Sequence, residues 1–426
     1  MIKDKLFKLF QYDFIFFRIG LFILPSAFPI ASFFIIFSLI SQTLKRRASF
    51  LKDKFNKTLI LISVLMIISC VVQNLLNIYI KDYGIESYLT WIGLFNWIPF
   101  FWIFWASQGF LETEEKRKII SEILCFSTIP VIFSGLGQQF FNWVGPLKFL
   151  NGLIVWYQRP IDDISGLTGL FNHANYAGSW LNLVLPICIS LLYYHSQNKK
   201  KSIFFLSILI GILVCIFLTN SRNAWGCTIL TIPIVIGIKS FRWFLPTLLG
   251  ISSLIAITTM KPFKGELQDT LRNIIPNKVW LEFTNEGFNT LDATRVEILN
   301  SAKEIIIANP LVGTGSGSFP IIYEFQTGFW KGHSHNLFTE FAISHGIPST
   351  IIFLIFLIYI IYISFTKIFK GSTNNISDKA LRTASFVFLI SQMIDIQYFD
   401  GRISLIFWLF LASLKCIAEE KNIDLK

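Results

Sequence analysis

The sequence predicts an all-α, polytopic integral membrane protein with about twelve transmembrane helices and one large loop on the outer side. Charged residues make up 15% of the 426 residues and hydrophobic residues 53%, whereas about 25% of a soluble domain is charged. The apolar residues come in runs of about 20, the length that a helix needs to cross a bilayer. These runs show no period-two alternation, which argues against the strands of a membrane barrel.

Basic clusters occupy the short connectors between the apolar runs. Cytoplasmic loops are enriched in lysine and arginine, so we expect these connectors and both chain termini to be cytoplasmic. Membrane anchoring therefore accounts for the net charge of +11, and we expect no nucleic acid as a partner. The clusters are Lys3-Lys5-Lys8, Lys45-Arg46-Arg47 with Lys52 to Lys57, Lys116-Arg117-Lys118, Lys199-Lys200-Lys201, Lys239 with Arg242, and Lys367 with Lys370.

This orientation fixes the path of the chain. Residues 12–44 must cross twice, as two short helices hinged near Pro25, Ser26 and Pro29. Residues 1–260 then hold helices 1–9, residues 261–335 form the outer loop, and residues 336–426 hold helices 10–12 and a cytoplasmic tail. The loop carries seven Lys/Arg against eight Asp/Glu, so the positive charge lies elsewhere. Further spans are predicted at 58–80, 88–110, 118–137, 169–195, 202–220, 223–241, 243–260, 336–365, 381–398 and 402–418.

Two arginines fall on the outer side, where the charge rule disfavours them. Arg222 lies in the tight turn 219–223, without an acidic neighbour in sequence. Its guanidinium could grip a phosphate with two parallel hydrogen bonds, or it could be a snorkelling anchor. Arg295 falls in the first turn of a predicted amphipathic helix that Asp292 caps and that ends near Ile307. A cation is disfavoured there, so an anionic ligand would explain it; the alternative is a solvated loop arginine.

The apolar positions 296, 299, 302, 305 and 306 define one face of this amphipathic helix. The glycine-rich run 309–319 follows the helix. It lacks the Gly-Lys-Ser/Thr ending of a nucleotide-binding loop, and no strand precedes it. We interpret it as a turn whose glycines let the backbone approach a neighbouring segment or ligand.

Two histidines stand where the outer loop enters the next span. His335 can accept a proton from a hydroxyl group, or it can simply be a helix-end residue that Asn336 caps. Glu340, an acid inside the span, could orient the His335 imidazole. His333 and His335 have no obvious third ligand in sequence, so we expect no metal site and no cofactor. Four more acids fall on the outer side, and the sequence pairs none of them: Asp162, Asp163, Asp395 and Asp400.

These motifs, in this order, resemble those of the O-antigen ligase-like membrane protein family. The matching stretches are residues 169–178, Ser221-Arg222, Arg295 with the run Asn309-Pro310-Leu311-x-Gly313-x-Gly315, and His335-Asn336 with Glu340 and Gly346-Ile347-Pro348. One departure occurs, because Asn172-His173-Ala174-Asn175 stands where the family commonly has Asn-Pro-Asn. The departure adds a histidine, His173, whose role the sequence does not indicate.

The resemblance implies a metal-independent glycosyltransferase at the periplasmic face of the bacterial inner membrane. The implied donor is a glycan on undecaprenyl diphosphate. A ligase would transfer it to a sugar hydroxyl of lipid A-core, and a polymerase to a second lipid-linked glycan. His335 would act as general base and Arg222 and Arg295 would hold the diphosphate. His333, Asn336 and Glu340 are the further candidates for substrate binding.

Ligase and polymerase share these requirements, so the sequence leaves both open. No Asp/Glu pair in the loop suggests a glycosidase. A transporter of lipid-linked sugars would need charged groups at mid-membrane, which most of the spans lack. A non-enzymatic membrane scaffold would leave the outer arginines and histidines dispensable.

Overall fold

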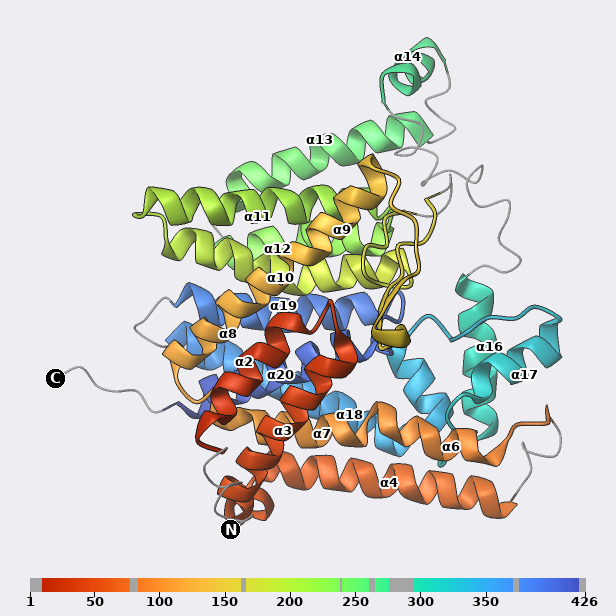
Figure 1. The fold of residues 1–426 in the computed structure, drawn as a ribbon. Helices are drawn as coiled ribbons and strands as arrows, with labels where there is room; N and C mark the ends of the chain where they lie inside the picture. The colour runs from red at the N-terminus through yellow and green to blue at the C-terminus, as the bar shows by residue number, and fades with distance from the viewer. Residues whose placement is uncertain are drawn as a thin grey trace.

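The computed structural model describes residues 10–76, 83–161, 166–237, 240–259, 265–275, 295–370 and 375–420. The described chain is a bundle in which most long helices lie side by side, with α16 and α17 projecting from one end (Figure 1). The only described strands form a small antiparallel hairpin, with Leu147 of β1 opposite Trp156 of β2. The predicted all-α fold class is confirmed.

The helices of the bundle and the two strands have the following bounds: α2 Asp13–Ile23, α3 Phe28–Arg46, α4 Lys54–Leu76, α6 Ser87–Gly93, α7 Ile98–Ala106, α8 Glu114–Ser127, α9 Ile129–Phe140, β1 Leu147–Phe149, β2 Ile154–Trp156, α10 Ala174–Tyr194, α11 Lys199–Leu218, α12 Arg222–Ile236, α13 Phe241–Thr259, α14 Glu266–Ile274, α16 Arg295–Ala308, α17 Ser318–Thr327, α18 Leu337–Lys370, α19 Ile376–Gln392 and α20 Gly401–Glu419.

Among the described residues, nine helical segments are long and apolar enough to cross a membrane. The helix α12 is apolar but shorter, with 15 residues. The helix α19 has 17 residues, of which Asp378, Lys379 and Arg382 are charged. Each span expected beyond residue 50 overlaps a described helix or consecutive helices, but the expected span 381–398 runs past the end of α19 at Gln392. The total of twelve spans stays a prediction.

Residues 13–46 form the expected pair of short helices. The Asp13 carboxylate at the start of α2 accepts hydrogen bonds from Ser41 and Lys45 at the end of α3, so the two helices are antiparallel. They are joined at residues 24–27, at the predicted hinge. With 11 residues, α2 rises only about 16 Å, roughly half of the hydrocarbon core.

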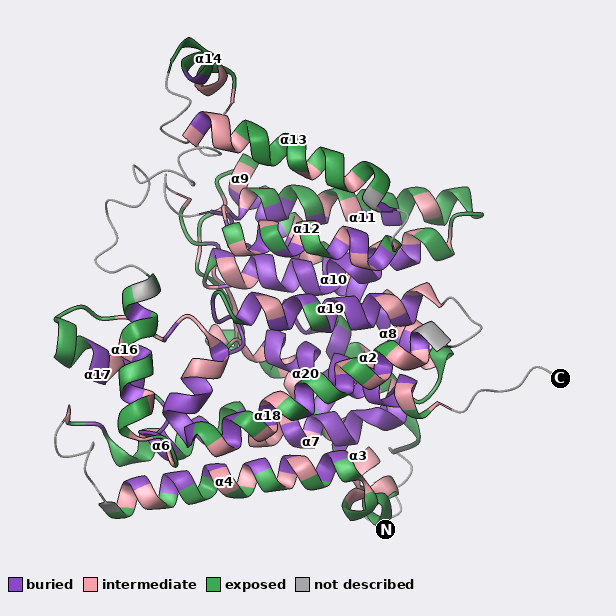
Figure 2. Cartoon of the chain, turned by 180° about the vertical axis from the view of Figure 1, so that it is seen from behind, coloured by how far each residue is buried: buried purple, intermediate pink, exposed green. Residues whose placement is uncertain are grey.

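The helix α20 lies at the centre of the bundle and is buried along nearly its whole length (Figure 2). It packs against α7, α18 and α19, and α10 packs against α19 on the far side. The outer helices α4, α11 and α13 expose many apolar side chains (Figure 2). Such side chains suit contact with lipid tails, as expected for the periphery of a membrane bundle.

Buried ion pairs hold together one end of the bundle, which we call the basic end. Here the starts of α8 and α19 meet the end of α20, because the Arg117 guanidinium pairs with both Asp378 and Glu420. Lys415 of α20 pairs with Asp53, which precedes α4. The buried cations Arg117 and Lys415 are thus each compensated by an acid, as a low-dielectric interior requires.

Several of the basic clusters noted in the sequence lie at this same end. Arg46 and Lys116 both approach the carboxylate of Glu112. Lys118 lies over the ring of Tyr194, at the end of α10. The opposite end of the bundle, where α10, α12, α18 and α20 begin, is called the site end below.

The glycine-rich run folds back onto a break in α18. The helix is interrupted at Gly346, whose φ is 81°. The backbone of the run forms hydrogen bonds with backbone groups that the break leaves without partners in the helix. Thr314 N–H donates to Ile343 O, and Ile347 N–H donates to Pro310 O. A Cβ atom on Gly313 would clash with the Ile343 carbonyl. The prediction that these glycines let the backbone approach a neighbouring segment is confirmed.

The amphipathic helix α16 packs beside α17 and α18, but its buried face differs from the expected one. Ile298, Ala302 and Ile305 are buried, whereas Leu299 is 36% exposed. The prediction for position 299 is therefore wrong, because the buried stripe is rotated by one position onto residues at i, i+4 and i+7. The proposed cap Asp292 lies outside the described residues.

We predict that Gly313→Ala lowers the thermal stability of the purified protein. The alanine Cβ would meet a backbone carbonyl, and the φ of 68° is unfavourable for a residue with a side chain. The expected cost is about 2 kcal/mol, measured by intrinsic tryptophan fluorescence during thermal unfolding in detergent. Gly226→Ala is the control, since its Cβ would have no atom within 4 Å. An equal effect of both changes would contradict this packing.

Candidate functional site

The segment that carries the two histidines is fixed by a hydrogen-bonded cap at the start of α18. The Asn336 Oδ1 atom accepts hydrogen bonds from Phe338 N–H and Thr339 N–H. Glu340 reaches back one turn and accepts a hydrogen bond of 2.9 Å from Ser334 N–H. These bonds satisfy free N–H groups at the helix start and hold the loop in place.

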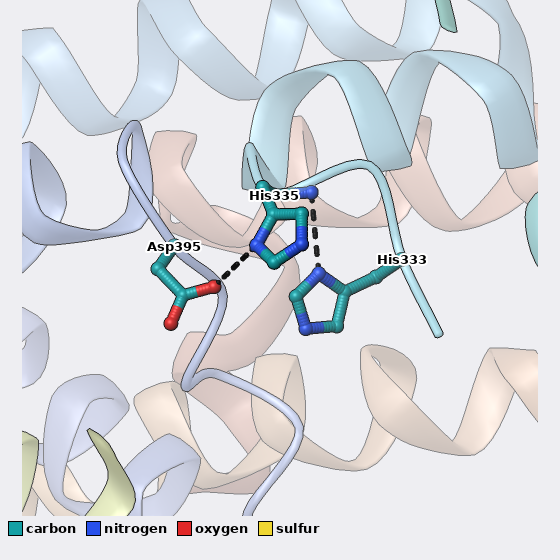
Figure 3. Close-up of side chains that lie close together, drawn as sticks. All are labelled: His333, His335 and Asp395. Atoms are coloured by element: carbon teal, nitrogen blue, oxygen red, sulfur yellow. Dashed lines mark hydrogen bonds and ion pairs between the residues drawn. The ribbon is translucent and has the colours of Figure 1, made fainter. Parts of the chain in front are cut away.

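His335 is held by an acid from the loop between α19 and α20. Its Nδ1 atom lies 2.7 Å from Asp395 Oδ1 (Figure 3). An ionised carboxylate can only accept, so His335 Nδ1 carries a proton, and in the neutral form of this ring the Nε2 atom keeps a lone pair. The backbone of His335 adopts a left-handed conformation with φ of 57°, which is uncommon for a residue with a side chain. The site therefore contains an oriented imidazole whose neutral form can accept a proton at Nε2.

Asp395 is buried, with 4% of its surface exposed. Its second oxygen, Oδ2, accepts hydrogen bonds of 2.6 Å from Asn175 and 2.9 Å from Gln397. Burial raises the pKa of this carboxyl, but the hydrogen bond from His335 and the charges of nearby groups outweigh burial and lower the pKa to about 2. Asp395 therefore remains ionised at physiological pH.

His333 has the opposite tautomer. Its Nδ1 atom accepts a hydrogen bond of 3.2 Å from His335 N–H (Figure 3). The ring proton of neutral His333 must then reside on Nε2, which can donate. Burial lowers the pKa of His333 to about 4, so this ring is neutral at pH 7. One histidine thus offers an acceptor and its neighbour a donor.

These groups line a pocket of about 290 Å³ at the site end. We call this the site pocket. Its walls come from the loop before α18, the α19–α20 loop, the start of α10 and the segment after β2. The lining residues are Arg159, Asn172, His173, Asn175, Tyr176, His333, His335, Asp395 and Ile396.

The structure changes the assignment of the group that orients His335. Glu340 bonds to the backbone of Ser334, and the hydrogen-bond partner of the imidazole is Asp395. Asn336 is a helix cap, and its side-chain amide also donates to Met393 O. Neither Glu340 nor Asn336 lines the site pocket.

The two predicted arginines lie near the site pocket without lining it. Arg295 begins α16 and is exposed. Its positive charge helps to lower the pKa of His333 and of Asp395, although burial and closer groups have larger effects on both pKa values. Arg222 begins α12 and is also exposed. The sequence singled out both but missed Arg159, which does line the pocket.

A chain of hydrogen bonds links the start of α12 to the pocket. Asn223, next to Arg222, donates to Ser391 Oγ and to Gln397 Oε1. Gln397 in turn donates to Asp395. The turn that presents Arg222 is therefore joined to the same network that holds His335.

The expectation that the two histidines lack a third potential metal ligand is wrong. The nearest ligand atoms of His333, His335 and Asp395 all lie within 4.8 Å of one another. Asp395 could not be recognised in the sequence because it is 60 residues from His335. Binding of a metal through His335 Nδ1 and His333 Nδ1 would, however, displace the two hydrogen bonds that set the tautomers.

The other outer acids have separate environments. Asp400 pairs with Arg402, whose guanidinium also donates to Leu170 O and lies 4.0 Å from the centre of the Phe171 ring. This pair anchors the chain just before α10. Asp162 and Asp163 lie outside the described residues.

Part of the chain matches a known protein family. Residues 208–354 match the model of the family described as O-antigen ligase. The resemblance predicted from the motifs is confirmed. The O-antigen ligase match includes Arg222, Arg295, His333 and His335. Arg159, His173, Asn175 and Asp395, which complete the site pocket, fall outside it. No protein with a curated description matches the chain.

Members of the O-antigen ligase family are membrane enzymes of the glycosyltransferase type, either ligases or polymerases. Lipid-linked glycans are the substrates that the match to this family implies. The position of the pocket at one end of an apolar helix bundle agrees with a substrate that is partly embedded in lipid.

We predict that His333 makes the folded protein sensitive to acid. The pKa of His333 is about 4 in the folded state and about 6.5 when the residue is solvated. The unfolded chain therefore takes up a proton that the folded chain does not, and stability falls as the pH drops from about 6.5 toward 4. His333→Gln keeps an acceptor for His335 N–H and should weaken this dependence, measured as melting temperature between pH 7 and pH 4.5. Parallel curves for both proteins would contradict a neutral, partly buried His333.

Proposed function

We propose that this protein is an O-antigen ligase that moves a glycan from undecaprenyl diphosphate to a sugar hydroxyl of lipid A-core. The observation that carries the proposal is the His335–Asp395 pair in a pocket at the site end. A carboxylate that holds Nδ1–H leaves Nε2 to act as a general base, the same arrangement that activates hydroxyl nucleophiles in hydrolases. The family match supports the same class of reaction.

The proposed reaction is a single displacement. The acceptor hydroxyl gives its proton to His335 Nε2 as its oxygen attacks the anomeric carbon of the donor sugar. The bond between that carbon and the diphosphate oxygen breaks, and the diphosphate leaves with the electron pair. Asp395 stabilises the imidazolium ion that forms. Attack from the face opposite the leaving group inverts the anomeric centre.

Positive charge near the pocket serves the leaving group. The bond that breaks places additional negative charge on the diphosphate, which cations and N–H donors stabilise. We assign this role to Arg222 and Arg295, which lie at the site end on α12 and α16. His333 Nε2–H supplies a neutral donor next to the base. Asn336 and Glu340 are proposed to hold in place the loop that carries the two histidines. Glu340 accepts a hydrogen bond from Ser334 N–H, and Asn336 donates one to Met393 O.

The basic end is proposed to face the cytoplasm and the site end the periplasm of a bacterial inner membrane. The positive-inside rule places lysine and arginine clusters on the cytoplasmic side. Both termini would then be cytoplasmic, and the site pocket would open where flipped lipid-linked glycans accumulate. Donor and acceptor lipids could both reach the pocket from the outer leaflet.

We predict that His335→Ala and Asp395→Asn each abolish most of the transfer without loss of folded protein. Asparagine in place of Asp395 can donate to Nδ1 and so favours the wrong tautomer of His335, with an expected loss of about 10²- to 10⁴-fold. The double variant should lose no more than His335→Ala alone, because the pair acts as a unit. The assay is glycan transfer by purified protein in proteoliposomes.

The control for these variants is Glu324→Gln, which removes an exposed carboxylate on α17 and should leave transfer unchanged. Near-normal transfer by His335→Ala would refute the assignment of the base. Multiplicative losses in the double variant would refute the coupling of Asp395 to His335.

The acceptor is identified by the lipopolysaccharide pattern of a deletion strain. For a ligase, we expect core without O-chain while lipid-linked polymer accumulates. Core that carries a single repeat unit would instead indicate the polymerase of the same family, which joins lipid-linked units with the same diphosphate and base requirements. An unchanged pattern would exclude both acceptors.

A further inference from the structure

Arg159 stands on a segment that buried polar side chains hold in place. Its backbone N–H donates to Thr168 Oγ1 at 3.1 Å, and its carbonyl accepts a hydrogen bond from Gln138 Nε2 of α9. The Gln138 Oε1 atom also accepts from Thr168 N–H and Gly169 N–H, so one side chain ties two segments together. The backbone of Arg159 is therefore fixed on both sides.

The residue before Arg159 is constrained as strongly. Gln158 is completely buried and has a φ of 34°, in the left-handed region. Its N–H donates to Gly169 O, and its side chain donates to Ser134 Oγ. A strained residue in a polar, buried setting is costly and persists where the surrounding structure determines it. The consequence here is a defined position for the next residue, Arg159.

The Arg159 side chain is exposed and lines the site pocket. No carboxylate of the described residues lies within ion-pair distance of its guanidinium. Asp395, the one acid that lines the pocket, is buried and already accepts hydrogen bonds from His335, Asn175 and Gln397. An arginine with a fixed backbone, in a pocket whose acid already has hydrogen-bond donors, suits an anionic ligand.

His173 adds a donor to the same wall. Its Nδ1 atom accepts a hydrogen bond of 3.1 Å from Asn175 N–H and so caps α10. The ring proton of neutral His173 must then be on Nε2. Burial lowers the pKa of His173, and the charge of Arg159 acts in the same direction. His173 is thus a neutral N–H donor that lines the pocket beside Arg159.

The residue before His173 offers an acceptor. Asn172 Oδ1 is buried and has no hydrogen-bond partner among the described residues. A buried acceptor without a partner is costly, and a sugar hydroxyl in the pocket would satisfy it. The wall formed by Arg159, Asn172 and His173 therefore combines one cation, one N–H donor and one acceptor.

We propose that Arg159 and His173 form an anion-binding pair that holds the diphosphate of the glycan donor. This inference rests on the proposed transfer and adds two residues to it. The base His335 and its partner Asp395 line the same pocket as the anion-binding pair. One pocket therefore holds both a candidate base for the acceptor hydroxyl and a candidate site for the leaving diphosphate.

The test uses the full-length protein in nanodiscs of neutral phosphatidylcholine and measures binding of inorganic pyrophosphate by calorimetry. Arg159→Gln should weaken binding by about 10- to 100-fold, because a charge-assisted hydrogen bond is lost. His173→Asn should weaken it about fivefold. Asparagine is a favoured helix cap, so this variant keeps the cap of α10 and removes only the N–H donor that lines the pocket. Arg159→Lys should restore part of the affinity.

The control is Arg47→Gln, which removes one exposed positive charge at the basic end and should leave binding unchanged. Equal pyrophosphate affinity in wild type, Arg159→Gln and His173→Asn would overturn the inference. Glucuronate is a second probe: if the two variants lose affinity for it and not for pyrophosphate, the anion is a sugar carboxylate and the diphosphate assignment is wrong.

Different results would refute the anion-binding pair and the proposed transfer reaction. His335→Ala should abolish transfer and retain pyrophosphate binding, since His335 is not part of the anion-binding pair. Loss of transfer in His335→Ala together with normal binding in Arg159→Gln would overturn only the anion-binding pair. Retained transfer in His335→Ala would overturn the proposed function itself.

Discussion

The Asp395 carboxylate joins three parts of the site that are remote in sequence. It accepts hydrogen bonds from His335 before α18, from Asn175 at the start of α10 and from Gln397 in its own loop. A buried carboxylate is costly unless donors satisfy it. Because these three donors satisfy it, the segments that provide them are held together. The tautomer of His335, and with it the chemistry of the pocket, depends on this one group.

Buried polar groups are satisfied in different ways at the two ends of the bundle. At the basic end, arginine and lysine pair directly with acids, as Arg117 does with Asp378. At the site end, Asp400 and Arg402 also form an ion pair, but helices stop or break there as well, and folded-back segments satisfy the exposed backbone, as the glycine-rich run does at Gly346. Irregular backbone at the edge of a membrane bundle is tolerated where protein or water covers it. This is the setting in which a polar pocket can form beside lipid.

Much of the fold was predictable because apolar runs and basic connectors have a direct physical meaning. The α2–α3 hinge and the start of α18 near Asn336 followed from these patterns. The pairing of Asp395 with His335 did not, because no local periodicity connects residues 60 positions apart. Glu340 was preferred in its place only because it lies about one turn from His335. Arg159 was missed because its segment is neither helical nor periodic, and its position depends on buried contacts with Gln138.

The tautomer of His335 can be measured, and it decides whether this residue can serve as the base. The chain has five histidines, so ¹⁵N-histidine NMR of the protein in lipid bilayers can resolve them, with the His335 signals assigned by their absence in His335→Gln. At pH 7.5 the account predicts a proton on Nδ1 of His335, hydrogen-bonded to a carboxylate, and an unprotonated Nε2. A proton on Nε2 with an unprotonated Nδ1 would contradict it, since such an imidazole could not accept the proton of the acceptor hydroxyl.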